Sequence, residues 1–189
     1  SITKVIYNPV VKENISFLAN QDLHHPFFNN EAKILVSVGR LHMQKDYPTL
    51  IEAFKIAQQS TSLPLKLILV GEGEERNSLE KIIEEYCLKD DISLVGYQEN
   101  PFAYMKKADL FVMSSLWEGL PSVLIEALAV GTPVVSTDCK AGPKEILENG
   151  KLGTLVPISD PPALANGIIE ELNKDRDHEE LVSRGKVFT

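Results

Sequence analysis

Short apolar runs alternate with amphipathic segments along most of this chain, and this alternation constrains the fold more than any other feature. From about residue 33 onward, runs rich in valine, isoleucine and leucine are each followed by a segment with helically spaced apolar residues. The runs are continuously apolar, which is typical of strands covered on both faces of a sheet. Strands and helices that alternate in this way form βαβ units. The sequence therefore predicts an α/β fold: a doubly wound, Rossmann-like parallel sheet of about six strands with helices on both faces.

The expected elements are short and closely spaced. The predicted strands cover residues 33–38, 65–70, 92–95, 109–113, 134–136 and 153–156. The predicted helices cover residues 47–59, 74–87, 102–107, 121–130, 143–148 and 161–172. A charged helical tail is expected from His178 onward, and Gly131 stands in the position preferred for a left-handed helix cap.

The first 32 residues differ from the rest of the chain. They hold one apolar run, Val5-Ile6-Tyr7, followed by polar sequence rich in asparagine and histidine. We therefore expect a linker or docking arm with one strand over residues 1–32 and a single α/β domain over residues 33–189. The start does not resemble a signal peptide, and the end stops where a helical pattern restarts, so we expect a piece of a longer chain.

Charge and cysteine content narrow the choice of partners. The chain has 27 acidic and 19 basic residues and a formal charge of −8, so no general positive field attracts nucleic acid or an anionic membrane surface. An anionic ligand must therefore be held by local groups. Cys87 and Cys139 fit no metal-binding spacing, which favours reduced thiols in a cytosolic protein. No apolar run approaches the roughly 18 to 20 residues that a transmembrane helix needs.

Two glutamates frame the most informative segment. Glu118 lies in the loop after the fourth predicted strand, and Glu126 lies in the second turn of the following helix. A helical rise of about 1.5 Å per residue places them at most about 12 Å apart, which suits one extended ligand held at both ends. Gly119, Leu120 and Pro121 open the helix between them. Free backbone N–H groups at a helix start form a natural phosphate site.

A second candidate site follows the first predicted strand. Gly39 allows close backbone approach there, and Arg40 and Lys45 supply two cations at the head of the next helix. An arginine fork matches the geometry of phosphate oxygens. Weaker features are the partial glycine pattern of residues 71–76, interpreted as a turn, and residues 141–146, which suit either a helix start or a donor-sugar contact.

The segment Trp117-Glu-Gly-Leu-Pro-Ser-Val-Leu-Ile-Glu126-Ala127 resembles the paired-glutamate signature of the family 4 retaining glycosyltransferases, which are group 1 glycosyl transferases. Gly39-Arg40 with Lys45 resembles the diphosphate-binding pair of the same family. The resemblance covers roughly residues 33–172. It implies the C-terminal, nucleotide-sugar-binding half of a GT-B fold, without the N-terminal domain that binds the acceptor.

The resemblance also implies a role for each candidate residue. Glu126 would hold the ribose hydroxyls and Glu118 the hydroxyls of the donor sugar. Arg40 and Lys45 would neutralise the leaving diphosphate. The backbone groups implied to assist belong to Gly96 and Tyr97 at the base and to Gly119, Leu120 and Ser122 at the diphosphate. Neither a metal nor another cofactor is expected.

The implied reaction transfers a hexosyl group, with retention, from a nucleotide-diphospho-sugar to a glycan or lipid-linked acceptor. We expect a UDP-sugar because that donor is frequent in the family. This chain alone is expected to bind the donor and to turn over little or nothing. The full-length protein is expected in the cytoplasm, and a peripheral position at the inner face of the membrane stays open for it.

Three alternatives remain at this point. A non-catalytic nucleotide-sugar-binding or regulatory module on the same fold would carry the same site residues. A dinucleotide oxidoreductase is disfavoured because Gly71-Glu-Gly73 lacks a third glycine and no acidic residue follows at the required distance. A phospho-receiver domain would need an acidic cluster where Gly39-Arg40 stands.

Overall fold

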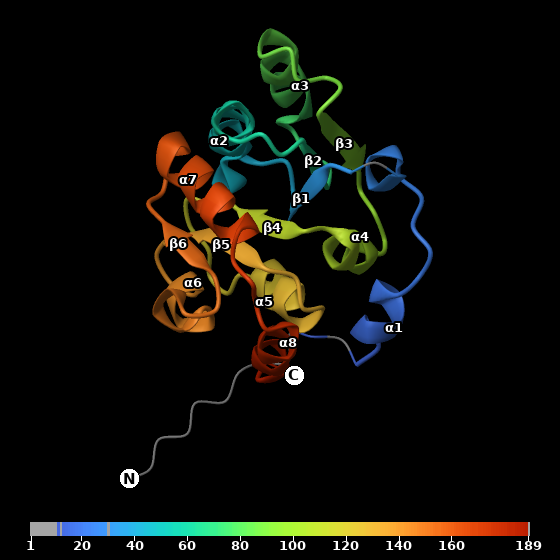
Figure 1. Cartoon of the computed structure of the whole chain (residues 1–189), viewed down its shortest axis with the longest axis vertical. Helices are drawn as coiled ribbons and strands as arrows, with labels where there is room; N and C mark the ends of the chain where they lie inside the picture. Colours follow the sequence, from blue (N-terminus) through green and yellow to red (C-terminus); the bar gives the residue numbers. More distant parts are fainter. Residues whose placement is uncertain (1–10, 12, 30, 189) are drawn as a thin grey trace.

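A computed structural model describes residues 11, 13–29 and 31–188, and it confirms the predicted α/β architecture. Six parallel strands form one sheet at the centre of the molecule (Figure 1). The strands are β1 Lys33–Val38, β2 Leu65–Val70, β3 Ile92–Gly96, β4 Leu110–Met113, β5 Val134–Thr137 and β6 Thr154–Val156. The predicted strand of residues 5–7 lies outside the described residues.

The strand order is β3-β2-β1-β4-β5-β6, so the winding direction reverses between β1 and β4. All pairings are parallel, which brings the carboxyl ends of the strands to one edge of the sheet. In open α/β sheets, ligands bind outside this edge, at the point where the order reverses. A ligand site is therefore expected at the loops that follow β1 and β4.

Helices cover both faces of the sheet, as Figure 1 shows. One face packs against α2 Tyr47–Ser60, α3 Arg76–Glu85 and α7 Pro161–Leu172. The other face packs against α4 Pro101–Lys107, α5 Ser122–Ala129 and α6 Pro143–Ile146. The helices α1 Ile15–Ala19 and α8 His178–Lys186 add buried residues to this second layer.

Adjacent residues of one strand serve different cores, because successive side chains of a strand point to opposite faces. In β1, Val36 packs into the core beneath α4 and α5, and Leu35 packs into the core beneath α2 and α7. Phe111 and Val112 of β4 divide in the same way. All four side chains are fully buried. Each such burial contributes about 1.5–3 kcal/mol, which explains why the strands are continuously apolar.

The helix ends differ slightly from the predicted ends. Gly131, after α5, has a φ of +80°, which confirms the left-handed cap. The predicted helix of residues 143–148 ends at Ile146 instead, because Glu148 and Asn149 adopt left-handed backbone angles of 49° and 57° in φ. A short 3-10 turn, Glu148–Gly150, follows.

The described part of the leader packs against the sheet domain. Ile15 and Ala19 of α1 are buried in the core on the α4 side. Asn100 Nδ2, just before α4, donates to the carbonyl oxygen of Leu18 at 2.8 Å. A 3-10 turn, Pro26–Asn29, continues toward β3, where His25 Nε2 lies 3.1 Å from Ser93 Oγ. This segment, expected as polar chain, thus contains one helical element and one 3-10 turn that pack on the domain.

Candidate functional site

An ion pair joins the two loops at the reversal of the sheet. Lys45 Nζ, after β1, lies 2.6 Å from Glu118 Oε1, after β4, and the two side chains are only 16% and 8% exposed. Ser115 Oγ donates to the same carboxylate oxygen at 2.7 Å. Within the described part of the chain, both of these partners bind Oε1, so the second oxygen of Glu118 is available to accept hydrogen bonds from a ligand.

Backbone and hydroxyl groups hold these loops together around the ion pair. The Leu116 amide donates to the Gln44 carbonyl oxygen at 2.8 Å, and Gln44 Nε2 donates to the Trp117 carbonyl oxygen at 2.8 Å. Ser114 Oγ donates to the Lys45 carbonyl oxygen at 2.6 Å. Each bond involves a residue next to, or within a few positions of, one member of the pair.

The loop after β1 owes its shape to local interactions. His42 Nδ1 accepts a hydrogen bond from the Gln44 amide at 3.1 Å and so caps the 3-10 turn Met43–Lys45. Asp46 then takes a left-handed conformation, with φ of 46°, before α2 begins. This turn places Lys45 at the carboxyl edge of the sheet.

Gly39 and Tyr47 pack against the Lys45 side chain. A Cβ atom on Gly39 would lie 2.9 Å from Lys45 Cε and 3.1 Å from the Tyr47 hydroxyl, so a side chain at position 39 would displace the lysine. The buried Tyr47 hydroxyl donates to the Gly39 carbonyl oxygen at 3.3 Å. Burial, together with the Glu118 charge, raises the pKa of Tyr47 well above its ordinary value, so Tyr47 stays neutral.

The negative charge of Glu118 also acts on the thiol of Cys139, at the start of the segment after β5. Burial raises the pKa of the Cys139 thiol, and the Glu118 charge adds to this effect. Trp117 forms an isolated parallel bridge with Lys140, and a Cβ on Gly142 would meet Pro121 Cδ at 2.5 Å. The 141–146 segment therefore begins beside the glutamate loop, as a donor-sugar contact would require.

Arg40 lies apart from the Lys45–Glu118 pair. Its side chain is 71% exposed and pairs with Glu74 at 3.0 Å, and His42 Nε2 lies 3.5 Å from the same carboxylate. A backbone hydrogen bond lowers the pKa of Glu74, with further lowering by Arg40 and His42. The two cations predicted for one diphosphate thus follow the same strand, but each has its own acidic partner.

A cavity of about 400 Å³ opens at the carboxyl ends of β1, β2 and β3. Its lining includes Gly39, Arg40 and Tyr97 from the predicted site. Gly96 lies beside the cavity, where its carbonyl oxygen accepts from the Gly71 amide at 2.9 Å. Sequence reasoning did not single out the remaining lining residues as ligand contacts: Val38, Val70, Gly71, Glu72, Gln98 and Pro101.

Gly71 carried a signal for this cavity that the turn interpretation did not use. Its φ is +148°, and a Cβ there would overlap the Gly39 carbonyl oxygen. The glycines after β2 therefore let two strand-to-helix loops pack closely and form one wall of the cavity.

The start of α5 differs in part from expectation. The Ser122 amide donates to the Leu120 carbonyl oxygen at 2.8 Å, so it reaches a phosphate only if this turn opens. Gly119 and Leu120 are exposed, and among the described residues, apart from the two chain neighbours of Gly119, no atom lies within 4 Å of a Cβ built on that glycine. Glu126 is half-buried in the second turn of α5, where the sequence placed it.

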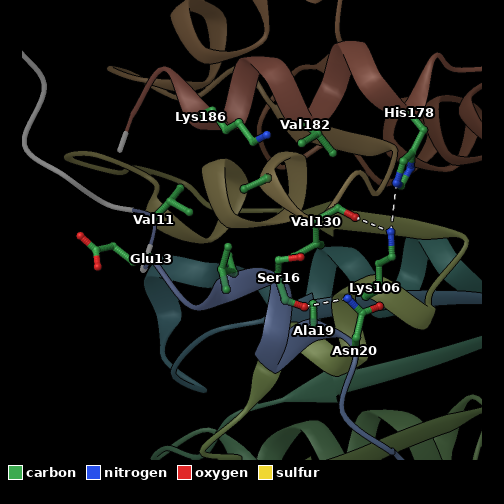
Figure 2. A pocket seen from close by; sticks show the side chains of 12 residues that line it. Val11, Glu13, Ser16, Ala19, Asn20, Lys106, Val130, His178, Val182 and Lys186 are labelled. Atoms are coloured by element: carbon green, nitrogen blue, oxygen red, sulfur yellow. Dashed lines mark hydrogen bonds between the residues drawn. The ribbon is translucent and has the colours of Figure 1, made fainter.

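A second cavity, of about 330 Å³, lies between α1, α4, α5 and α8 (Figure 2). Lys106 Nζ donates to the Val130 carbonyl oxygen at 3.0 Å and lies 3.0 Å from His178 Nε2 (Figure 2). Because an ammonium group only donates, His178 Nε2 acts as the acceptor in this contact. None of the predicted site residues lines this cavity, so the candidate site at the carboxyl edge is separate from it.

Over residues 11, 13–29 and 31–188, no group of three or more histidine, cysteine or acidic side chains is arranged to hold a metal ion. In the same ranges, every helix is too short or too polar to cross a bilayer.

The family model described as "Glycosyl transferases group 1" matches residues 20–188. The chain belongs to this family. Solved structures that are similar to this glycosyltransferase domain are GT-B enzymes, and the similarity agrees with the parallel, doubly wound sheet of this chain.

Curated relatives of this glycosyltransferase domain include bacterial and archaeal proteins. An uncharacterized glycosyltransferase of Methanocaldococcus jannaschii is 40% identical over 147 residues, which is 77% of this chain and 36% of the relative. The N-acetylgalactosamine-N,N'-diacetylbacillosaminyl-diphospho-undecaprenol 4-alpha-N-acetylgalactosaminyltransferase of Campylobacter jejuni is 34% identical over 173 residues, which is 92% of this chain and 45% of the relative. The chain therefore spans less than half the length of these relatives.

Solved structures show the same domain. S. aureus TarM, in a complex that contains UDP, superposes with a TM-score of 0.74 at 28% identity, covering 83% of this chain and 32% of that one. The pneumococcal O-GlcNAc transferase GtfA, in complex with UDP and GlcNAc, gives a TM-score of 0.75 at 23% identity, covering 84% and 33%. At 23% identity, the similarity to GtfA shows a common fold and nothing further.

Proposed function

We propose that this glycosyltransferase domain is the donor-binding, C-terminal half of a family 4 retaining enzyme. The observation that carries this proposal is the Lys45–Glu118 pair, 2.6 Å across, between the loops after β1 and β4. It lies where a doubly wound sheet binds its ligand. A cation and a carboxylate with one available oxygen are the groups that a diphospho-sugar requires at the junction of phosphate and sugar.

The donor would lie along the carboxyl edge of the sheet. The base would occupy the cavity beside Gly96 and Tyr97, and Glu126 would accept hydrogen bonds from the ribose hydroxyls. Arg40, released from its exposed pair with Glu74, and Lys45 would bind the diphosphate. The amides of Gly119, Leu120 and Ser122 would add to this charge once the turn at Leu120 opens. The second oxygen of Glu118 would bind the donor sugar.

Catalysis would then depend on stabilising the leaving group. When the bond between the anomeric carbon and the diphosphate breaks, negative charge grows on the terminal phosphate. Preorganised cations and amides that face this charge lower the barrier, commonly by several kcal/mol. Arg40 and Lys45 are the charged groups proposed for this task, so the proposal requires no metal. The acceptor hydroxyl would come from the other domain of the full-length protein and would replace the diphosphate with retention at the anomeric carbon.

For the whole protein, we propose transfer of a hexosyl group from a UDP-sugar to a glycan or lipid-linked acceptor. The names of the relatives support this choice, because the Campylobacter jejuni enzyme is named for a diphospho-undecaprenol acceptor. We place the full-length enzyme in the cytoplasm, at the inner face of the membrane if its acceptor is lipid-linked. By itself the chain would bind donor without measurable transfer.

Calorimetric titration of the chain with nucleotide sugars tests the proposal. We expect saturable binding of a UDP-sugar and of UDP, and none of comparable strength for nicotinamide dinucleotides. Glu126→Ala should lower the affinity for both UDP and UMP by about tenfold, because each ligand contains the ribose. The matched control is Glu52→Ala, an exposed helix glutamate on α2. Absence of nucleotide-sugar binding, or equal effects of the two substitutions, contradicts the proposal.

A further inference from the structure

We infer that Gln44 is a positioning residue, which clasps the loop after β1 to the loop after β4 and so sets the geometry of Lys45 and Glu118. Its importance for donor recognition rests on the function proposed above. Gln44 is not among the residues expected to touch the donor. It reaches across to the opposite loop with both its backbone and its side chain.

The sheet alone does not hold these two loops together. β1 pairs with β2 over all six of its residues, from Lys33 to Val38. Its register with β4 covers only Leu35 and Val36, so the ladder ends before either strand reaches its carboxyl end. The loops that carry Lys45 and Glu118 therefore start beyond the point where the ladder between β1 and β4 stops. Other bonds have to fix their separation.

Gln44 supplies two of these bonds. Its carbonyl oxygen accepts from the Leu116 amide, and its side-chain Nε2 donates to the Trp117 carbonyl oxygen, both at 2.8 Å. Gln44 directly precedes Lys45, and Trp117 directly precedes Glu118. A clasp at these two positions acts one residue away from both members of the ion pair.

The loop after β4 has a further anchor in the sheet. The buried Thr137 Oγ1, in β5, donates to the Ser115 carbonyl oxygen at 2.7 Å. Ser115 in turn holds Glu118 through its hydroxyl. The glutamate side of the pair is thus tied to β5, and the Gln44 clasp joins the lysine side to that anchored loop. A third bond across the gap, from Ser114 Oγ to the Lys45 carbonyl oxygen, supports it.

Substitution of Gln44 can test the side-chain bond separately from the backbone bond. Gln44→Ala removes the donor to Trp117 and keeps the Leu116 bond. Gln44→Glu keeps the length and replaces the donor with an acceptor, which cannot bind a carbonyl oxygen while ionised. Gln58→Ala is the matched control, because Gln58 Nε2 also donates one bond, to Asp91 at 2.9 Å, on a remote part of the domain.

The first measurement needs no nucleotide. Trace acetylation of the folded chain, followed by peptide mass spectrometry, reports the reactivity of Lys45 relative to the exposed Lys81. In the starting protein, Lys45 should react slowly because its ammonium group is paired and largely buried. Gln44→Ala and Gln44→Glu should raise its relative rate severalfold, whereas Gln58→Ala should leave it unchanged.

The second measurement compares UDP with UMP by calorimetric titration. If Gln44 positions Lys45 for the diphosphate, both Gln44 variants should lose about five- to tenfold in UDP affinity, the effect of roughly one hydrogen bond, and less than about twofold for UMP. A merely structural role of Gln44 would lower the affinity for both ligands alike and would lower the urea unfolding midpoint in parallel.

Each outcome decides the inference. Unchanged Lys45 reactivity in both variants overturns it, and so does higher reactivity combined with unchanged selectivity for UDP over UMP. If the starting protein binds no nucleoside diphosphate, the proposed function fails. In that case faster acetylation of Lys45 in the Gln44 variants still supports the clasp, and an unchanged rate rejects it.

Discussion

Two largely buried acid–base pairs of this domain have different surroundings. Glu171, at the end of α7, has a fully buried side chain, and both of its oxygens are bound. Arg176 donates to Oε1 at 2.6 Å and to Oε2 at 2.9 Å, and Thr154 donates to Oε2 at 2.7 Å. Glu118 is nearly as buried, but its two protein partners share one oxygen.

The difference separates a structural pair from a pair that suits ligand binding. Both oxygens of Glu171 are bound and its side chain is fully buried, so a ligand cannot reach it and the pair serves to stabilise the fold. A carboxylate that is not fully buried and has one available oxygen keeps its binding capacity. Breaking the first pair should therefore cost stability, and breaking the second should cost mainly ligand affinity.

The largest effect is expected from Arg176→Ala. The substitution leaves the Glu171 charge buried with Thr154 and the more distant Lys174, which lies 3.6 Å away. Loss of one partner of a buried pair costs about 3–5 kcal/mol, so the free energy of unfolding in urea should fall by about that amount. The control is Lys89→Ala, whose pair with Glu84 is exposed and whose removal should change little. Equal effects of the two substitutions would remove the basis of the comparison.

Lys45→Ala should have the opposite effect, with a small loss of stability and a large loss of UDP affinity. We expect a loss of only about 1–2 kcal/mol in unfolding free energy, because Glu118 keeps its hydrogen bond from Ser115 and its side chain is not fully buried. UDP affinity should fall by about 10- to 100-fold, as for loss of a charge-assisted hydrogen bond, while uridine binding stays nearly constant. Urea unfolding and calorimetry measure the two quantities on the same sample. A large loss of stability without loss of UDP affinity would make this pair structural too.

The smallest effect is expected from pH. Burial acts to raise the pKa of Glu171, but hydrogen bonds from Arg176 and Thr154 outweigh burial and hold the pKa below the ordinary value of 4.5. A carboxyl group with a lowered pKa in the folded state stabilises the fold fully above its unfolded pKa, and this contribution is lost as pH falls through the folded pKa.

Glu171→Gln isolates that contribution, because the other carboxylates are common to both proteins. The gap in unfolding free energy between the starting protein and the variant should be largest near pH 7 and should narrow as the pH is lowered below about 4.5. Urea unfolding from pH 7 to pH 3 measures it. A gap that widens on acidification would contradict the lowered pKa.

The sequence predicted the layers of this fold because they depend on local patterns. Continuous apolar strands and helically spaced segments are visible in short windows, and all six expected strands are present within a residue or two. The left-handed angles of Glu148 and Asn149 were missed, since neither residue type demands them there. The doubly wound sheet was predicted, but the position of its reversal, between β1 and β4, depends on how distant segments pack, which a short window of sequence does not record.

In the candidate site, too, the features that are local in the sequence were predicted and those that depend on distant contacts were not. Glu118 lies in the loop before α5 and Glu126 lies within α5, as their positions in the sequence predicted. The direct bond between Lys45 and Glu118 links residues 73 positions apart and depends on the Gln44 contacts between two loops. The pair of Glu171 with Arg176 was not predicted either, because a glutamate near a helix end usually faces solvent.

Each cation proposed for the diphosphate already lies against an acid, Arg40 beside Glu74 and Lys45 beside Glu118. The two ion pairs therefore carry little net charge, in a protein of formal charge −8. Such a site does not draw a polyanion in from solution, so its rate of capture should be modest and little accelerated at low ionic strength. The pyrophosphate is then bound through short-range contacts alone, when it replaces Glu74 beside Arg40 and meets Lys45.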